Sequence, residues 1–460
     1  MPGAQRIELR PPSSRPVLLY GGTVLTMDAE ATVLPRAEIL IQNGRIAAIG
    51  RSLTLIPGTR LIDIQGHLVL PGLIQGHIHL GQTFFRGLGE GRHLLPWLRE
   101  RIWPLEAAHD DESAYWCSLQ GAAECLLGGT TTVQDIGLGP GFRGLLQALL
   151  DSRMRGITGK CLMDDGAALP TGLRQRAEET LVDTESLGLE LPGRPGGRVS
   201  YSLNPRFILT CSDRLWLGIR ELADRHGWPI HTHALEHRDE AQAVRQLKGG
   251  RDEIEYFDEH GILDADLRIA HGVQLTEGHY PKVVGRRVGV VHCPAANLKL
   301  GSGVADVVGH RRAGIPVGVG CDGAGCNNGL DVLEELRLAA LLQANARGPG
   351  SFSGVDALRL ATSEGARVLG LGDRIGTVEQ GKDADLTVLA LDRPEMAAAE
   401  GVDPHDLVVF GASRSQVRHV FVAGEQLVED GRLTHLDLPT LLDKASAARN
   451  ALVARAQIDA

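Results

Sequence analysis

Short apolar runs alternate with amphipathic segments through most of the chain, and this alternation restricts the folds open to it. Helical patterns separate the runs, for example DDESAYWCSLQGAAECLLGG, SDRLWLGIRELADRHG and LDVLEELRLAALLQANA. Eight strands that alternate with helices over roughly 270 residues predict an α/β fold, a (β/α)8 TIM barrel. A doubly wound sheet is disfavoured because no Gly-rich dinucleotide fingerprint follows the first strand. The runs lie at residues 68–80, 130–136, 156–163, 198–209, 228–235, 267–273, 288–293 and 315–321.

Patterns typical of β-strands at both ends of the chain predict a second, smaller domain. VLLYGGTVLTM, AEILIQNGRIAAIG and TRLIDIQGHLVL precede the first barrel strand, with Gly-Gly and Asn-Gly at the turns. GTVEQGKDADLTVLA, DLVVFGA and QVRHVFVAGEQLVEDGRL form a matching set near the other end. Because a small sheet alone is marginal, we expect both ends to form one β-sandwich domain. The predicted division is 1–69 and 375–460 for this domain, with an outer helix at 437–457, and 70–374 for the barrel.

Composition and charge indicate a soluble globular protein. Hydrophobic residues make up 43% of the chain and charged residues 23%, which supports a large buried core. The formal charge of −10 is spread along the chain and argues against a nucleic-acid surface. No apolar run approaches the ~20 residues needed to span a bilayer. Residues 1–16 lack the apolar centre of a signal peptide, and PGRPGG at 192–197 is typical of a loop.

The cysteines indicate a reducing compartment. They are seven, scattered, and include no CxxC pair, so a disulfide framework is disfavoured. We therefore expect a cytoplasmic protein. The charge and the short apolar runs predict no nucleic-acid or membrane partner, and the one partner expected is a small-molecule substrate. The cysteines are Cys117, Cys125, Cys161, Cys211, Cys293, Cys321 and Cys326.

Ionisable side chains stand at the ends of five of the eight predicted strands. The first strand ends with His77 and His79, whose side chains share one face because residues i and i+2 of a strand point the same way. Barrel chemistry occurs where the strands end. Three histidines and one carboxylate there would hold a metal ion and leave a position for water. The other strand ends carry HTHALE at 231–236, His271, His292 and Asp322.

The fifth strand offers two histidines, and the pattern alone does not separate them. His231 and His233 point to the same side of the strand. We favour His233 as the ligand because it is nearer the strand end and Glu236 follows it by three residues, within reach of a bound water. His231 would then lie one layer deeper, in the core or as a partner of a ligand.

These motifs, in this order, resemble the amidohydrolase superfamily. PGLIQGHIHLGQTFFRGL, WLRERIWPLEA, HTHALEHRDE, HCPAANLKLGSG, CDGAGCNNGLD and GTVEQGKDADLTVL are similar to its cytosine deaminase-like branch. That branch includes adenosine-type and S-adenosylhomocysteine deaminases, guanine deaminases and s-triazine hydrolases. The resemblance covers nearly the whole chain. It implies a barrel with a split β domain and, at the level of the family, a homo-oligomer (a homodimer or larger).

The resemblance also implies roles for single residues. Glu236 matches the acid/base that moves a proton from water to a ring nitrogen, assisted by Asp322. His271 matches the residue that orients the water or polarises the attacked carbon's substituent. Many members with two metal ions use a carboxylated lysine at the end of the fourth strand, but RVSYSLNPRFIL has none. We therefore predict one divalent ion per chain, zinc or iron. The residues that match the metal ligands are His77, His79, His233 and Asp322.

The predicted substrate contacts resemble two different subgroups. Trp97 and Glu106 match pocket positions of the adenosine-type deaminases. Gln82 and Arg206 instead resemble guanine deaminases, where such residues hold the polar edge of the purine. Adenosine-type members tend to have His in place of Arg206, and Arg suits a carbonyl or carboxylate acceptor. Three asparagines fit either the site or turns, namely Asn297, Asn327 and Asn328.

The implied activity is hydrolytic deamination of an amino-substituted nitrogen heterocycle, a purine base or purine nucleoside, with release of ammonia. One alternative is an s-triazine-type chlorohydrolase or alkylaminohydrolase that uses the same site. A non-catalytic scaffold barrel is the alternative of another class. It is disfavoured because all four ligand positions and Glu236 are present. A secreted hydrolase is disfavoured by the N-terminal sequence.

Overall fold

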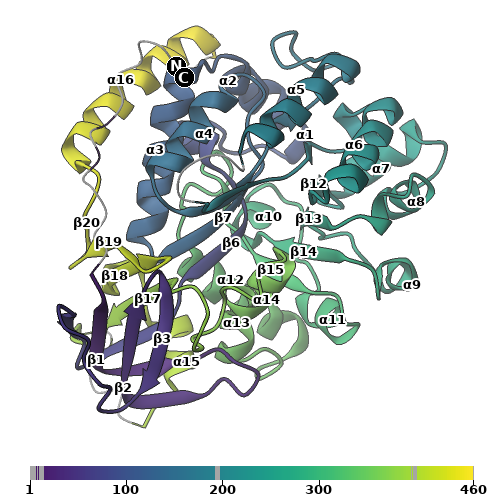
Figure 1. Ribbon diagram of the computed structural model, residues 1–460. Helices are drawn as coiled ribbons and strands as arrows, with labels where there is room; N and C mark the ends of the chain where they lie inside the picture. The colour runs from purple at the N-terminus through teal and green to yellow at the C-terminus, as the bar shows by residue number, and fades with distance from the viewer. Residues whose placement is uncertain are drawn as a thin grey trace.

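The predicted alternation of strands and helices is present as a closed parallel barrel in the computed structural model, which describes residues 7, 9, 15–191, 197–394, 396 and 401–458. Of the predicted loop at 192–197, only Gly197 lies inside this part of the chain, and most of the segment 1–16 lies outside it. In Figure 1 the barrel strands occupy the centre with helices around them, and the strands of the small sheet lie at the lower left. The barrel strands are β6 (Leu73–His79), β7 (Thr130–Asp135), β8 (Arg155–Thr158), β10 (Val199–Tyr201), β12 (Ile230–Ala234), β13 (Leu267–His271), β14 (Val288–His292) and β15 (Val317–Val319).

Two parallel arcs close the barrel. One has the order β10-β8-β7-β6-β16, where β16 is Asp322–Gly323, and the other has the order β12-β13-β14-β15. β15 continues almost directly into β16, which pairs with β6. A parallel bridge between Leu203 and Ile230 joins the arcs on the opposite side. The short strands β9 (Cys161–Leu162) and β11 (Asn204–Pro205) pair with each other at the end of β8 and β10. The carboxyl ends of these strands therefore meet at one rim.

The predicted helices are confirmed, with their caps. The pattern at 110–129 is α3 (Asp111–Leu127), that at 212–227 is α6 (Asp213–His226), and that at 330–346 is α12 (Val332–Arg347). Ser212 caps α6 by accepting the N–H of Leu215, and Gly227 ends it in the left-handed conformation. Local chemistry is sufficient to set both ends of this helix.

The other helices connect the strands or cover the barrel and the small sheet. They are η1 (Leu80–Phe85), α1 (Leu94–Trp97), η2 (Leu98–Ile102), α2 (Trp103–Ala107), α4 (Phe142–Asp151), α5 (Ala177–Glu190), η3 (Ile208–Thr210), α7 (Arg238–Leu247), α8 (Glu253–Glu259), η4 (Ile262–Asp264), η5 (Glu277–His279), α9 (Tyr280–Val283), α10 (Pro294–Lys299), α11 (Val307–Arg312), α13 (Gly354–Leu360), α14 (Ser363–Val368), α15 (Pro404–Asp406), η6 (Leu407–Gly411), η7 (Arg414–Gln416) and α16 (Leu438–Ala456).

Both ends of the chain pair into one sheet, as predicted. Two details of the prediction were wrong: DLVVFGA at 406–412 lies in the helical segments α15 and η6 and adds no strand, and Gly21 and Gly22 lie inside β1 instead of at a turn. The order of the sheet is β20-β19-β18-β17-β5-β1-β2-β3, and β4 pairs with β1. The antiparallel contact between β17 and β5 joins the two ends. The predicted helix at the end of the chain, α16, packs on the outside against α3 (Figure 1). The fold class is therefore confirmed, while the domain limits at 69/70 and 374/375 stay predictions. The strands are β1 (Val17–Leu25), β2 (Val33–Gln42), β3 (Arg45–Gly50), β4 (Arg60–Asp63), β5 (His67–Pro71), β17 (Leu386–Ala390), β18 (Val417–Val422), β19 (Glu425–Glu429) and β20 (Arg432–Leu433).

The apolar run at 68–80 is two strands, not one. It divides at Pro71 and Gly72, so that β5 joins the small sheet and β6 enters the barrel. A Cβ atom on Gly72 would lie 2.2 Å from a methyl carbon of Thr131, so only glycine fits at this close approach. The Gly72 N–H donates to the carbonyl of Asp385 just before β17. The junction between sheet and barrel thus leads directly into the strand that ends in His77 and His79.

Within the described residues, no helix is both long enough and apolar enough to cross a membrane.

Candidate metal centre and active site

Four buried side chains at the barrel rim present ligand atoms to one point. They come from β6, β12 and β16, and the atoms lie within 4.8 Å of one another. Asp322 Oδ1 lies 3.2 Å from Nε2 of both His77 and His79, and Nε2 of His79 lies 3.0 Å from Nε2 of His233. Ligands about 2 Å from a tetrahedral ion are about 3.3 Å apart. The buried Nε2 of His77 has no hydrogen-bond partner among the described residues. The donor set therefore fits a divalent metal ion.

The opposite nitrogen of each histidine has a partner that fixes the ring. Nδ1 of His233 donates to the carbonyl of Arg206 at 2.7 Å. Nδ1 of His77 lies 2.8 Å from Nε2 of His231, and Nδ1 of His79 lies 3.1 Å from the amide of Gln82. Such partners orient metal-binding imidazoles, and the carbonyl of Arg206 fixes the tautomer of His233, because it can only accept. His233 thus lies in the cluster and His231 lies behind His77, while the role of His233 as a ligand stays a prediction.

The protonation states also suit a metal. Burial lowers the pKa of His79 and His233 and keeps both imidazoles neutral. Burial would raise the pKa of Asp322, but the imidazoles of His77 and His79 beside its carboxylate hold that pKa well below its usual range. Neutral nitrogens and an ionised carboxylate are the forms that bind a divalent cation.

Glu236 and His271 lie beside this centre. Nε2 of His271 is 3.5 Å from Oε2 of Glu236 and 3.9 Å from Oδ2 of Asp322. Burial, and then the charge of Asp322, raise the pKa of Glu236 well above its usual value. Burial lowers the pKa of His271 to about 4. A carboxyl of raised pKa beside a neutral imidazole is suited to general acid–base catalysis.

Asn297, at the start of α10, orients His271. Its Oδ1 lies 2.9 Å from Nδ1 of His271 and accepts a hydrogen bond from the Nδ1–H group. The unprotonated Nε2 of His271 then faces Glu236. The two other asparagines left open by the sequence do not line the pocket. Asn327 bonds the carbonyl of Cys321, and Asn328 bonds the exposed segment before α1.

The backbone is strained where these side chains project. Leu235, His271 and Asp322 have φ values of 57°, 77° and 60°, in a region that residues other than glycine seldom adopt. Such outliers persist when the surroundings hold them, and they concentrate at functional sites. Here they direct Glu236, His271 and Asp322 toward one pocket.

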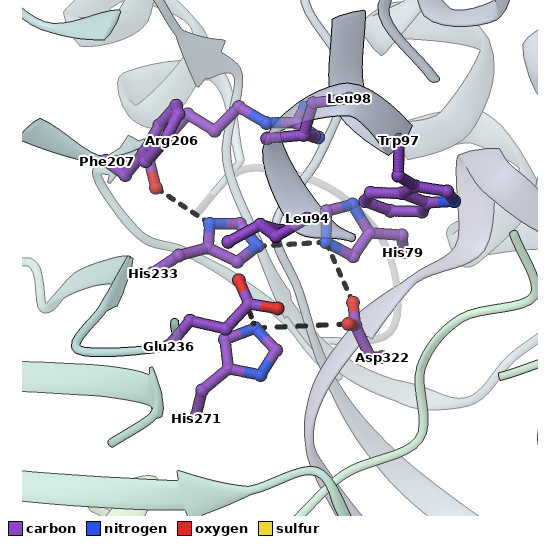
Figure 2. A pocket seen from close by; sticks show the side chains of 10 residues that line it. All are labelled: His79, Leu94, Trp97, Leu98, Arg206, Phe207, His233, Glu236, His271 and Asp322. Carbon is purple, nitrogen blue, oxygen red and sulfur yellow. Dashed lines mark hydrogen bonds and ion pairs between the residues drawn. The ribbon is translucent and has the colours of Figure 1, made fainter. Parts of the chain in front are cut away.

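That pocket holds about 330 Å³ of empty space, which includes its opening to solvent. Figure 2 shows Arg206 and Trp97 at the top of the view and Glu236 and His271 below the metal-ligand histidines. Trp97 and Arg206 thus line the pocket, and their contact with substrate stays a prediction. Its apolar wall was not anticipated from the sequence, because leucines of short helical turns carry no distinguishing signal. The lining is His79, Leu94, Trp97, Leu98, Arg206, Phe207, His233, Glu236, His271 and Asp322.

Gln82 and Glu106 lie behind the pocket wall instead of on it. Arg206 donates to Oε2 of Glu106 at 2.6 Å, and the Gln82 amide donates to Oε1 at 2.9 Å. Both carboxylate oxygens of Glu106 are therefore occupied. Burial would lower the pKa of Arg206, but the charge of Glu106 raises it, so the guanidinium stays charged. In this arrangement Glu106 fixes Arg206, and Arg206 faces the pocket.

Comparison with known proteins gives concordant matches. The family model described as "Amidohydrolase family" matches residues 68–427. A "5-methylthioadenosine/S-adenosylhomocysteine deaminase" of Pelotomaculum thermopropionicum is 33% identical over 95% of this chain and 99% of its own length.

Two solved structures are similar over nearly all of both chains. One is an adenosine deaminase from Xanthomonas campestris with bound zinc (TM-score 0.88, 29% identity, 96% of this chain and 100% of that one). The other is the atrazine chlorohydrolase of Arthrobacter aurescens complexed with zinc (TM-score 0.86, 27% identity, 94% of this chain and 100% of that one).

Proposed function

The chain belongs to the amidohydrolase family, and from this premise we propose that it is a metal-dependent aminohydrolase. It would remove the amino group of a nitrogen heterocycle, a purine base or purine nucleoside, and release ammonia. The observation that carries this proposal is the position of Glu236. This buried carboxyl of raised pKa lies 3.5 Å from His271, beside three histidines and an aspartate that fit one ion.

His77, His79, His233 and Asp322 would hold the ion, and we propose one ion per chain, zinc in preference to iron. A bound divalent ion supplies Lewis acidity, which lowers the pKa of a coordinated water from 15.7 toward ~7. A zinc-bound structure of similar fold supports this choice of metal.

Glu236 would act twice in the reaction. It removes a proton from the attacking water as the oxygen bonds to the ring carbon that carries the amino group. It then delivers that proton to the ring nitrogen. The second proton of the water, on the hydroxyl of the adduct, passes to the amino group with the help of Asp322, so that the carbon–nitrogen bond breaks, ammonia leaves and a carbonyl remains beside the protonated ring nitrogen. His271 is neutral, with Nδ1 bonded to Asn297, so its Nε2 accepts a hydrogen bond from the water and orients it.

The proposal of a purine substrate rests on the wall opposite Glu236. Trp97 offers an aromatic surface to a flat ring, and Arg206 offers charged donors to an acceptor on its edge. The relative with 33% identity is named for adenosine-type substrates. The two oxygens of Glu106 already accept hydrogen bonds from Arg206 and Gln82, so the donor that faces the pocket is Arg206. This favours a substrate whose carbonyl accepts a hydrogen bond from Arg206. We therefore propose an aminopurine, as the base or the nucleoside.

The second candidate is hydrolysis of an s-triazine with loss of chloride or an alkylamine, supported by the similar structure of the atrazine enzyme. Both reactions add water to an electron-poor ring carbon. A non-catalytic scaffold has no support from the site, because the ligand set and Glu236 are complete. We also propose a cytoplasmic homo-oligomer, on family grounds.

The test is a product assay on the metal-loaded full chain with adenosine, 5′-methylthioadenosine, guanine, 8-oxoguanine, a pterin and two s-triazines, one chlorinated and one alkylaminated. We expect ammonia from at least one purine. Release of chloride or alkylamine from the triazines, with every purine inert, would establish the second candidate in its place. No product from any compound would contradict the proposal of a heterocycle hydrolase.

A further inference from the structure

The turn that carries Glu236 is strained and is held from several sides. Leu235, directly before it, has a φ of 57°, which a leucine adopts only under constraint. The carbonyl of Leu235 accepts the N–H of Gln274 at 2.8 Å, and that of Ala234 accepts the N–H of Gly272 at 3.3 Å. These two bonds fix the strand side of the turn. Neither bond holds the backbone of Glu236, which follows Leu235 in the turn.

The restraint on Glu236 comes from Glu240 in the first turn of α7. Its Oε2 accepts the backbone N–H of Glu236 at 2.8 Å and that of His237 at 3.3 Å. We propose that Glu240 is a positioning residue, which holds the backbone of Glu236 so that its carboxyl points at His271 and the metal centre. This inference rests on the proposed role of Glu236 and adds a residue to the machinery of the same site.

A comparison within the chain separates this role from ordinary helix capping. Glu255 occupies the same third position in the next helix, α8, and its Oε2 accepts the N–H of the capping residue Asp252 at 3.0 Å. Glu255 is exposed and has no contact with the pocket lining, whereas Glu240 is 1% exposed. Glu240 also bonds the residue before the cap, which is Glu236 itself. The Glu240 bond therefore reaches the catalytic residue, and the Glu255 bond does not.

The backbone amides of Glu236 and His237 both donate to one oxygen of Glu240. The restraint therefore requires a side chain of this length with an acceptor oxygen, and it does not require a charge. Burial, and then the charge of buried Glu253, raise the pKa of Glu240 to about 8, so an uncharged carboxyl is present at neutral pH. A glutamine keeps the acceptor oxygen at the same distance from the backbone. An aspartate keeps the carboxyl but is one methylene too short. The two variants therefore separate position from charge.

The experiment compares Glu240→Gln and Glu240→Asp in the metal-loaded full chain, with Glu255→Asp as the matched control. Ammonia release is measured from 5′-methylthioadenosine or guanine, whichever is turned over faster. We expect Glu240→Asp to lower kcat about tenfold or more, with KM and metal content changed less than about threefold, because a displaced acid loses alignment. Glu240→Gln should keep kcat within about threefold of the parent, and so should Glu255→Asp.

Equal losses in Glu240→Gln and Glu240→Asp, or no loss in Glu240→Asp, would overturn the inference. Hydrogen exchange of the peptide 235–241 gives a second reading that needs no substrate. The amides of Glu236 and His237 should exchange faster in Glu240→Asp than in the parent and in Glu240→Gln, and unchanged exchange would contradict the restraint. Failure of the parent to release ammonia would count against the proposed function alone, because hydrogen exchange still tests Glu240.

Discussion

Nε2 of His231 lies 2.8 Å from Nδ1 of His77, and both imidazoles are fully buried. With a metal ion held at Nε2 of His77, Nδ1 would carry the proton and donate a hydrogen bond to His231. His231 would then fix the ring of a proposed ligand without joining the ligand set. The HTH motif of the fifth barrel strand would thus supply both a proposed ligand, His233, and the partner of another, His77.

Replacing His231 should weaken metal binding. We expect His231→Leu to lower metal affinity about 10–100-fold, because the His77 ring loses the acceptor that sets its tautomer. His231→Gln keeps an acceptor and should lose less. Competition with a chromophoric chelator measures both affinities, and equal affinity of the parent and His231→Leu would show that the contact is only packing.

Glu236→Gln should separate turnover from metal binding. The amide keeps the shape of the side chain but cannot exchange a proton, so we expect kcat to fall about 10²–10⁴-fold. Metal content should not change, since Glu236 is outside the ligand set. Ammonia release and elemental analysis of the same preparation provide the test. Turnover near that of the parent would remove Glu236 from the proposed mechanism.

The purified chain should contain about one divalent ion. The fourth barrel strand region carries no lysine that could bridge a second ion, and the four clustered side chains suit one. Removal by a chelator should abolish activity, and one equivalent of zinc should restore it. Elemental analysis that finds two ions per chain, both needed for activity, would make the single-ion proposal wrong.

Arg206→Lys should impair substrate binding more than the chemical step. The guanidinium of Arg206 has several fixed donors, so it can bond Glu106 and still face the pocket, whereas a lysine ammonium cannot do both. We therefore expect KM to rise about tenfold with a smaller change in kcat. The exposed pair of Arg214 with Glu178 offers a control, in which Arg214→Lys should change neither constant. If KM for every substrate stays unchanged, Arg206 is a structural partner of Glu106 and does not contact substrate.

Acid should destabilise the protein partly through His109. Its Nε2 donates to the carbonyl of Gly81 at 2.9 Å, and burial lowers the pKa of His109 from 6.5 to about 4. The unfolded chain therefore takes up a proton below pH 6.5 that the folded chain takes up only near pH 4. The stabilisation is complete above pH 6.5 and is lost as the pH falls through 4, by about 3 kcal/mol in total. His109→Gln keeps a donor to Gly81, so its unfolding free energy should fall less steeply with acid, and parallel curves would contradict this assignment.

Strand positions and the clustering of the proposed metal ligands were predictable because they depend on short-range rules. A two-residue period places His77 and His79 on one face, and the ends of parallel strands share one rim. The positions of Gln82 and Glu106 depend instead on which polar partner each side chain finds in the folded chain. Arg206 lies a hundred residues after Glu106, and no local pattern predicts that the two bond. The same holds for Asn297, which only the folded barrel brings to His271.

The placement of β17 beside β5 has a consequence for synthesis of the chain. β5 ends at Pro71 and β17 begins at Leu386, so roughly 300 residues are translated in between, which takes on the order of 15–60 s. During that interval the edge of β5 has no partner, although its residues are apolar and typical of a strand. Unpaired strand edges are prone to aggregation. The nascent N-terminal sheet should therefore need protection by the ribosome or a chaperone until the last sixth of the chain emerges.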